Sequence, residues 1–205
     1  MKEKPLMVAL DLEGVLIPEI WIAVAEKSGI EKLRLTTRDV SDYDELMRGR
    51  LQLLEKHGLT IDDIQQVISQ LRPLAGAYEF LSELRRRAEV ILLSDTFYQF
   101  AAPLMAQLDW PTLFCNSLVI DADGRIVDYR LRQKDGKRQA VKALKGLNFE
   151  VIAAGDSYND TTMLAEADLG ILFRPSQSVA EEFADFRIAE DYETLEQYID
   201  EYVNE

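Results

Sequence analysis

The chain has 205 residues, of which 47% are hydrophobic, so it can form one folded core with a small insertion. It carries 23 basic and 37 acidic residues. The resulting net charge of -14 argues against nucleic acid and anionic membranes as partners, because both bind clusters of Lys and Arg. The single cysteine, Cys115, excludes an internal disulfide and is expected to be buried. With neither a signal peptide nor a run of about 20 apolar residues, the chain is expected to be a soluble cytoplasmic protein.

Short, continuous apolar runs predict buried strands of a parallel sheet. In chain order they are residues 6–10, 90–93, 151–154 and 169–173. Amphipathic patterns at 78–87 and 138–144 predict helices between these strands, and the acidic tail 192–205 predicts a surface helix. An Asp-Gly pair at 123–124 predicts a hairpin at an edge of the sheet. This alternation is typical of an α/β fold, a doubly wound parallel sheet with helices on both faces.

The segment that follows the first strand interrupts the alternation, because its pattern is helical throughout. We therefore predict two domains: an α/β catalytic core made of residues 1–16 and 72–205, and an all-helical cap made of residues 17–71. A cap inserted beside the strand tips is placed to act as a lid. Trp21 and Trp110 are expected to pack in the core or between core and cap.

Acidic and hydroxyl side chains follow three of the predicted strands. They are Asp11 and Glu13, Ser94 and Asp95, and Asp156. Ligands bind at the carboxyl ends of strands in an open parallel sheet. Carboxylates that meet there repel each other unless a cation lies among them, and a few hard oxygen ligands suit Mg²⁺. One such Asp alone is more simply a turn or cap residue, but three strand ends together predict a magnesium site.

Four ordered motifs resemble those of the haloacid dehalogenase superfamily of phosphatases. Asp-Leu-Glu-Gly-Val-Leu at 11–16 resembles the first motif, and Leu-Leu-Ser-Asp at 92–95 resembles the second. Gly-Asp-Ser-Tyr-Asn-Asp at 155–160 resembles the fourth, in the form found in phosphoserine phosphatases. The third motif is a lysine before a helix, for which Lys137 is preferred and Lys134 stays open. These motifs span most of the chain, and the resemblance implies a Rossmann-like core.

The resemblance also implies a mechanism. Asp11 is the implied nucleophile, which attacks phosphorus and becomes an aspartyl phosphate, and Glu13 is the implied general acid and base. The implied Mg²⁺ ligands are Asp11, the Glu13 backbone carbonyl and Asp156, with Asp160 orienting a water of the metal. The implied phosphate-binding residues are Ser94, Lys137 and Asn159.

Glu13 departs from the superfamily, in which most members carry Asp at this position. The extra methylene moves the point at which a proton is given and taken. Our hypothesis is that the longer side chain favours an acceptor alcohol over water, or slows the attack of water.

A helical cap straight after the first motif resembles the arrangement in phosphoserine phosphatases. In that family an acid after the first motif pairs with the substrate ammonium, and a cap arginine pairs with its carboxylate. Glu19 and Arg50 fit these positions, although the pattern alone equally fits a helix-terminal acid and an exposed helix charge. Asp95, where relatives usually have Gly, adds an acid for binding an ammonium. Together with Glu13, these features resemble a bacterial subgroup that also transfers the phosphoryl group from phosphoserine to homoserine.

Three alternatives remain open at this point. A receiver-type regulatory module also holds an aspartyl phosphate, but it lacks a helical lid and an acid placed like Glu13. A dehalogenase shares the nucleophile but does not need Mg²⁺, which leaves the other acids unexplained. A phosphatase of a sugar phosphate would leave Glu19 and Arg50 without an amino-acid head group to bind. The sequence is compatible with a homodimer and leaves the preferred acceptor open.

Overall fold

The computed structural model describes residues 4–36, 39–40 and 42–204. Within these residues the chain forms a seven-stranded sheet with the order β4-β3-β2-β1-β5-β6-β7. The strands are β1 (Leu6–Leu10), β2 (Glu89–Phe97), β3 (Thr112–Ile120), β4 (Ile126–Arg130), β5 (Glu150–Gly155), β6 (Leu169–Phe173) and β7 (Arg187–Ala189). Neighbouring strands are parallel except β3 and β4, which form the antiparallel hairpin that the Asp-Gly pair predicted.

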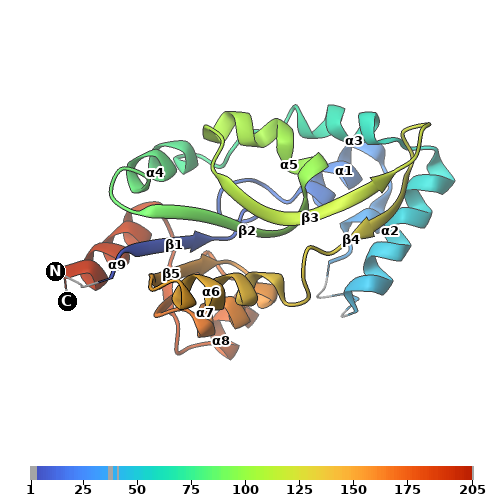
Figure 1. Ribbon diagram of the computed structural model, residues 1–205. Helices are drawn as coiled ribbons and strands as arrows, with labels where there is room; N and C mark the ends of the chain where they lie inside the picture. The colour runs from blue at the N-terminus through green and yellow to red at the C-terminus, as the bar shows by residue number, and fades with distance from the viewer. Residues whose placement is uncertain (1–3, 37–38, 41, 205) are drawn as a thin grey trace.

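Helices cover both faces of the sheet (Figure 1). They are α1 (Ile20–Ser28), α2 (Tyr43–His57), α3 (Ile61–Ile68), α4 (Ala77–Leu84), α5 (Tyr98–Met105), α6 (Gly136–Gly146), α7 (Thr161–Glu166), α8 (Gln177–Glu182) and α9 (Tyr192–Asn204), with 3₁₀ turns η1 (Glu31–Arg34), η2 (Ala106–Leu108) and η3 (Tyr158–Asp160). Val8 and Leu10 of β1 pack with α4, α5 and α9, whereas Ala9 packs with α6, α7 and α8. Burial on both faces explains the continuous apolar run of this strand, and the predicted doubly wound fold is confirmed.

Strand β2 differs from its prediction because it continues past Leu93 to Phe97. Leu93 pairs with Phe114 and Phe97 pairs with Asn116, so four steps along β2 correspond to two steps along β3. An irregularity of this kind takes residues out of the ladder and re-aims their side chains. The segment that begins at Ser94 is therefore displaced from the ladder at the tip of the sheet.

The predicted helical segment forms α1, η1, α2 and α3, at the end of the molecule where the β3–β4 hairpin also lies (Figure 1). The Ile61 backbone N–H donates to the Gly124 carbonyl at 2.9 Å, and Arg48 pairs with Asp128 at 2.8 Å. Apolar residues of these helices belong to the same hydrophobic cluster as the sheet. The division into a core and a cap domain stays a prediction.

Three smaller expectations have different outcomes. Trp21 is buried and packs edge-on against Phe100, with ring centres 5.4 Å apart, as expected. The expectation for Trp110 is wrong: it is 66% exposed, because a left-handed turn at Asp109 and Trp110 directs it to solvent. Cys115 is buried and free.

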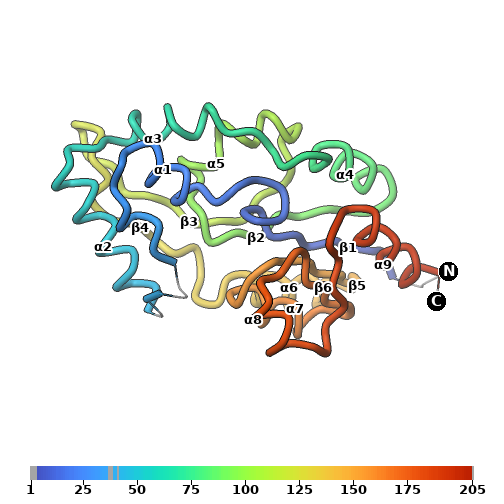
Figure 2. Tube along the Cα trace, turned by 180° about the vertical axis from the view of Figure 1, so that it is seen from behind, coloured from blue at the N-terminus to red at the C-terminus, as the bar shows by residue number. Residues whose placement is uncertain are grey.

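The C-terminal helix α9 packs against β6 and β7, near the beginning of β1 (Figure 2). Its predicted inward positions Leu195 and Ile199 are buried, whereas Tyr198 and Tyr202 are half-buried. Among the described residues, none of the helices combines the length and the apolar character needed to cross a membrane.

Candidate active site

The site lies where the direction of the sheet reverses. From β1 the chain proceeds outward through β2 and β3, and it later returns to β5 on the other side of β1. The Asp11 N–H donates to the Ala154 carbonyl at 2.9 Å, which holds the tips of β1 and β5 together. Asp11, Asp156 and Asp160 each place a carboxylate oxygen within 4.8 Å of the others. The predicted meeting of acids at neighbouring strand tips is therefore present.

Lys137, on the first turn of α6, lies buried among three carboxylates. Its Nζ is 2.7 Å from Asp160 Oδ1, 2.9 Å from Asp11 Oδ1 and 3.5 Å from Asp95 Oδ2. Burial is the largest influence on the pKa of Lys137 and lowers it, but the three carboxylates outweigh burial and raise the pKa well above its ordinary value. Lys134 is exposed on the preceding loop, so the geometry favours Lys137 as the motif lysine.

The acids fit a divalent cation. Burial and then the charge of Asp160 raise the pKa of Asp156 to about 7, and the same two causes raise the pKa of Asp11 against the opposing charge of Lys137. Asp156 Oδ1 is buried and has no hydrogen-bond partner among the described residues. A buried, unpaired carboxylate oxygen beside two more carboxylates matches the hard oxygen ligands that Mg²⁺ prefers.

Asp160 holds the backbone after β5 and the Lys137 ammonium in place. Its Oδ2 accepts from the backbone N–H groups of Asp156 at 3.0 Å and Ser157 at 3.1 Å, and its Oδ1 is bound by Lys137. Both carboxylate oxygens of Asp160 are therefore engaged within the protein. Its predicted role of orienting a water of the metal remains a prediction.

Two glycines allow the acids to approach, and the sequence reasoning missed both. Gly14 has a φ of 78°, and a Cβ there would lie 2.5 Å from Asp156 Oδ2. A Cβ on Gly155 would lie 2.3 Å from Asp160 Cγ. The available signal was a glycine close in sequence to a candidate acid, which indicates close backbone approach.

Glu13 lies between the tip of β1 and the cap helices. Its Oε2 accepts from the Ile20 N–H at 2.9 Å, at the beginning of α1. Burial raises the pKa of Glu13, while the Ile20 N–H, the Thr96 side chain and the Arg50 charge oppose the shift. A carboxyl group with a raised pKa in the same cavity as Asp11, the predicted nucleophile, suits general acid and base chemistry.

A cavity of about 470 Å³, here called the reaction cavity, lies between these groups and helices α1 and α2 of the predicted cap. Glu19 and Arg50 both line it, as do Asp11, Glu13 and Asp156. Glu19 is an exposed residue that lines the cavity edge, and partial desolvation of its carboxyl group, followed by the charge of Glu13, raises its pKa to about 7.

Arg50 is a buried cation. Its guanidinium stacks over Trp21, 4.5 Å from the ring centre, and Nη2 donates to the Leu35 carbonyl at 2.6 Å. No ion pair between described residues involves Arg50, and its buried Nε lacks a partner. Burial lowers the pKa of Arg50 to about 10. An anion in the reaction cavity would satisfy this group.

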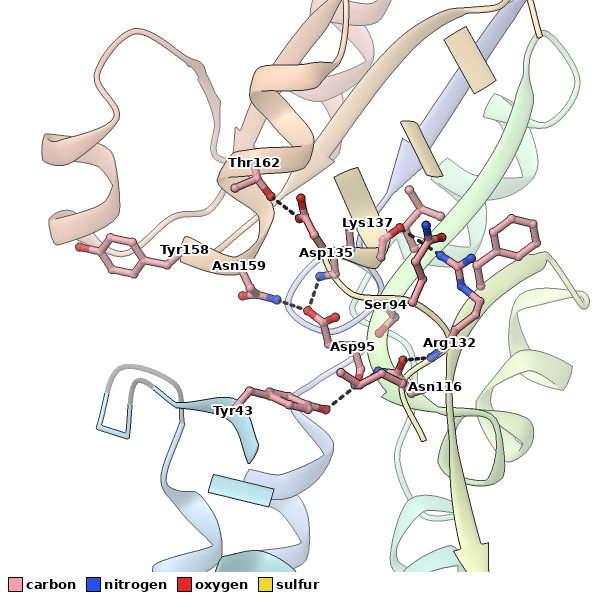
Figure 3. Close-up of a pocket in the computed structure, with 15 residues that line it drawn as sticks. Tyr43, Ser94, Asp95, Asn116, Arg132, Asp135, Lys137, Tyr158, Asn159 and Thr162 are labelled. Atoms are coloured by element: carbon pink, nitrogen blue, oxygen red, sulfur yellow. Dashed lines mark hydrogen bonds and ion pairs between the residues drawn. The ribbon is translucent and has the colours of Figure 1, made fainter. Parts of the chain in front are cut away.

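The remaining predicted residues meet at the tip of β2 (Figure 3). Ser94 is buried and lines the reaction cavity. Asp95 was predicted to bind a substrate ammonium, but its Oδ2 accepts from Asn159 Nδ2 at 2.8 Å and lies near Lys137. Sequence reasoning also missed Tyr43, whose hydroxyl donates to the Asp95 carbonyl at 3.2 Å, because a link across 52 residues leaves no local pattern.

Comparison with known proteins agrees with this site. The family model of haloacid dehalogenase-like hydrolases matches residues 7–168. A phosphoserine phosphatase of Pseudomonas syringae pv. tomato is 60% identical over 186 residues, which cover 91% of this chain and 78% of that protein. The phosphoserine phosphatase ThrH of Pseudomonas aeruginosa is also 60% identical, with 91% of each chain covered.

Solved structures share the fold. A phosphoserine phosphatase in its apo form has a TM-score of 0.78 at 23% identity, covering 95% of this chain and 99% of that one. A phospho-aspartyl intermediate analogue of phosphoserine phosphatase has a TM-score of 0.77 at 24% identity, covering 96% and 99%. The matched region contains Asp11, Lys137 and Asp156, whose side chains meet at the strand tips. The chain belongs to the haloacid dehalogenase-like hydrolases, and within them to the phosphoserine phosphatase family.

Proposed function

We propose that this enzyme is a magnesium-dependent phosphoserine phosphatase that works through an aspartyl phosphate on Asp11. The observation that carries the proposal is Arg50, a buried cation that forms no ion pair with the residues the structure describes and lines the same cavity as Asp11. An amino-acid carboxylate fits this cation, and an ammonium fits Glu19 across the cavity. The 60%-identical relatives named phosphoserine phosphatase support the same substrate.

The residues divide the chemistry between them. Asp11 attacks phosphorus as the bond to the serine oxygen breaks, and Glu13 gives that oxygen a proton. Glu13 then takes a proton from the incoming water or alcohol, whose oxygen attacks phosphorus and releases Asp11. Ser94, Lys137 and Asn159 hold the phosphoryl oxygens. Asp11, the Glu13 carbonyl and Asp156 would hold Mg²⁺, which when bound neutralises charge on the phosphoryl group.

We further propose homoserine as a second acceptor, so that the enzyme is also a phosphotransferase. Glu13 supports this, because its extra methylene moves the point at which a proton is given and taken relative to an Asp. The same proposal treats residues 17–71 as the lid and places the enzyme in the cytoplasm, where a single free cysteine stays reduced.

The test is a phosphatase screen over phosphorylated amino acids and sugar phosphates, with and without Mg²⁺ and homoserine. We expect phosphoserine to be preferred, and Arg50→Ala to raise KM for phosphoserine by about 100-fold, since a charged hydrogen-bonding partner is lost. Arg48→Ala is the matched control, because Arg48 is an exposed arginine on the same helix that pairs with Asp128. Activity confined to sugar phosphates, or equal KM values in both variants, would overturn the assignment.

A further inference from the structure

A second cavity of about 480 Å³ adjoins the reaction cavity (Figure 3). Its outer lining includes the exposed residues Leu131, Arg132, Gln133 and Asp135, and we call it the outer cavity. The two cavities share six lining residues, which are Tyr43, Ser94, Asp95, Lys137, Tyr158 and Asn159. Ser94, Lys137 and Asn159, which we propose to hold the phosphoryl group, therefore line both cavities.

Three of the residues that line both cavities, Tyr43, Asp95 and Asn159, are joined by hydrogen bonds, and we call them the partition. The Tyr43 hydroxyl donates to the Asp95 carbonyl at 3.2 Å, and Asn159 Nδ2 donates to Asp95 Oδ2 at 2.8 Å. Each residue comes from a different element: α2 of the predicted cap, the tip of β2, and η3 after β5. Figure 3 shows one dashed line from Asn159 and another from Tyr43, both reaching Asp95.

The partition is anchored on both sides. On the cap side, the Tyr43 ring packs edge-on against Tyr129 with centres 5.9 Å apart. On the core side, Asn116 is buried, donates to the Asp95 carbonyl at 3.0 Å, and accepts from the Arg132 N–H at 3.0 Å. The partition therefore depends on α2 lying where it does, because Tyr43 is its only member from the cap segment.

An aspartyl phosphate can be consumed by two nucleophiles. When water attacks phosphorus, the bond to the Asp11 oxygen breaks, Glu13 takes the proton, and inorganic phosphate is released. When an alcohol attacks, the same bond breaks and a phosphate ester is formed. The outcome depends on how much water reaches the reaction cavity while the alcohol is bound.

We propose that the partition excludes water of the outer cavity from the reaction cavity and thereby favours an alcohol over water as the phosphoryl acceptor. This inference rests on the proposed aspartyl-phosphate chemistry. Tyr43 acts as a positioning residue, since it touches Asp95 and not the reacting atoms. Relatives usually carry Gly at the position of Asp95, and Gly would remove this side chain from the partition.

Tyr43→Phe tests the inference, because it removes one hydroxyl and keeps the ring. The readout is the ratio of inorganic phosphate to phosphohomoserine formed from phosphoserine at a fixed homoserine concentration. Both products come from the same active enzyme, so the ratio does not depend on how much of a variant folds. We expect the ratio to rise about fivefold, the effect of one lost neutral hydrogen bond, and to rise further in Asp95→Ala.

Tyr129→Phe is the matched control. The Tyr129 hydroxyl donates to Asp44 Oδ1 at 2.6 Å, and Asp44 lies next to Tyr43 on α2. Tyr129 lines neither cavity. Its ratio should equal that of the parent.

A second arm replaces homoserine with isotopically labelled serine and compares label incorporated into phosphoserine with phosphate release. Failure of the parent to use homoserine would reject homoserine transfer, while the serine arm still tests the partition. Parent-like ratios for Tyr43→Phe and Asp95→Ala in the serine arm would overturn it.

Discussion

At the scale of single residues, the site is governed by a shortage of positive charge. Lys137 is the single ammonium within 3.5 Å of Asp11, Asp95 and Asp160 among the described residues, and Asp156 adds a fourth carboxylate. Unpaired buried charges cost several kcal/mol each, so such a cluster must retain protons or gather cations. Burial first, and then the charge of Asp160, raise the pKa of Asp11 and bring the pKa of Asp156 to about 7.

Asp11→Asn should abolish turnover without unfolding the protein. We expect phosphoserine hydrolysis to fall at least about 10³-fold, because an amide cannot form the phosphoenzyme. The thermal midpoint should not fall, since the substitution removes one of several repelling carboxylates. Asp62→Asn, at an exposed position on α3, should match the parent in both assays. Retention of a tenth of the activity by Asp11→Asn would remove it as the nucleophile.

Glu13→Asp should shift the enzyme toward hydrolysis. The shorter side chain cannot reach both the Ile20 N–H and the reacting oxygen, so the proton acceptor is less well placed for a bulky alcohol. We expect the ratio of phosphate to phosphohomoserine to rise about threefold at fixed homoserine. Glu26→Asp, at an exposed site on α1, provides the baseline. An unchanged ratio in Glu13→Asp would contradict a role for side-chain length.

At the scale of elements, turns and irregularities decide where the chemistry sits. The displaced segment of β2 carries Ser94 and Asp95, and the glycine turn after β1 lets Asp156 approach the backbone. Regular strands alone would point alternate side chains to opposite faces of the sheet. The departures from regularity bring them to one edge.

Gly14→Ala should damage the site through its turn. The left-handed backbone costs an L-residue about 1–2 kcal/mol, and the new Cβ would collide with the Asp156 carboxylate. We expect a lower thermal midpoint together with at least about tenfold weaker Mg²⁺ binding by calorimetry, in line with disturbed metal ligands. Gly49→Ala is the control: its Cβ meets nothing within 4 Å inside α2, so it should stabilise the protein slightly. Equal Mg²⁺ affinity in the two variants would argue against a metal at Asp156.

At the scale of the whole molecule, the charge of -14 and the acidic cluster link folding stability to pH and metal. Between about pH 4 and pH 7 the folded protein holds a proton on Asp156 that the unfolded chain releases. Stability of the metal-free protein therefore falls as pH rises through this window and levels off above it. Carboxylates with lowered pKa values, such as Asp168, add to the folding stability as pH rises, but they do so below about pH 4, outside this window.

Chemical denaturation in the presence of a chelator should show this loss between pH 5 and pH 7.5. The shift of Asp156 from 3.8 to about 7 sets an upper limit of about 4 kcal/mol for its share. Added Mg²⁺ should restore stability at pH 7.5 and have little effect at pH 5. Asp156→Asn should make the metal-free profile less steep, and Glu19, whose pKa is also raised to about 7, should account for part of the remaining slope. A variant profile as steep as that of the parent would assign the pH dependence to other groups.

The sequence by itself determined the doubly wound sheet, the helical segment after β1 and the acids at the strand tips. These features depend on local apolar periodicity and on polar residues at strand ends, both of which can be read over a few positions. The motifs also identified Asp11, Lys137 and Asp156 as a group. Trp110 shows the limit, since a short left-handed turn reversed the expected direction of its side chain.

Only the tertiary structure decided which lysine is buried, what Asp95 binds and how helices α1 to α3 contact the sheet. The sequence favoured Lys137 but left Lys134 open, and burial of Lys137 among three carboxylates separates the two. Asp95 contacts Asn159 and Tyr43 across 64 and 52 residues, respectively. Such contacts follow from packing of distant segments, so no local pattern encodes them. The sequence therefore predicted the acids at the strand tips, whereas the contacts that form the partition were visible only in the tertiary structure.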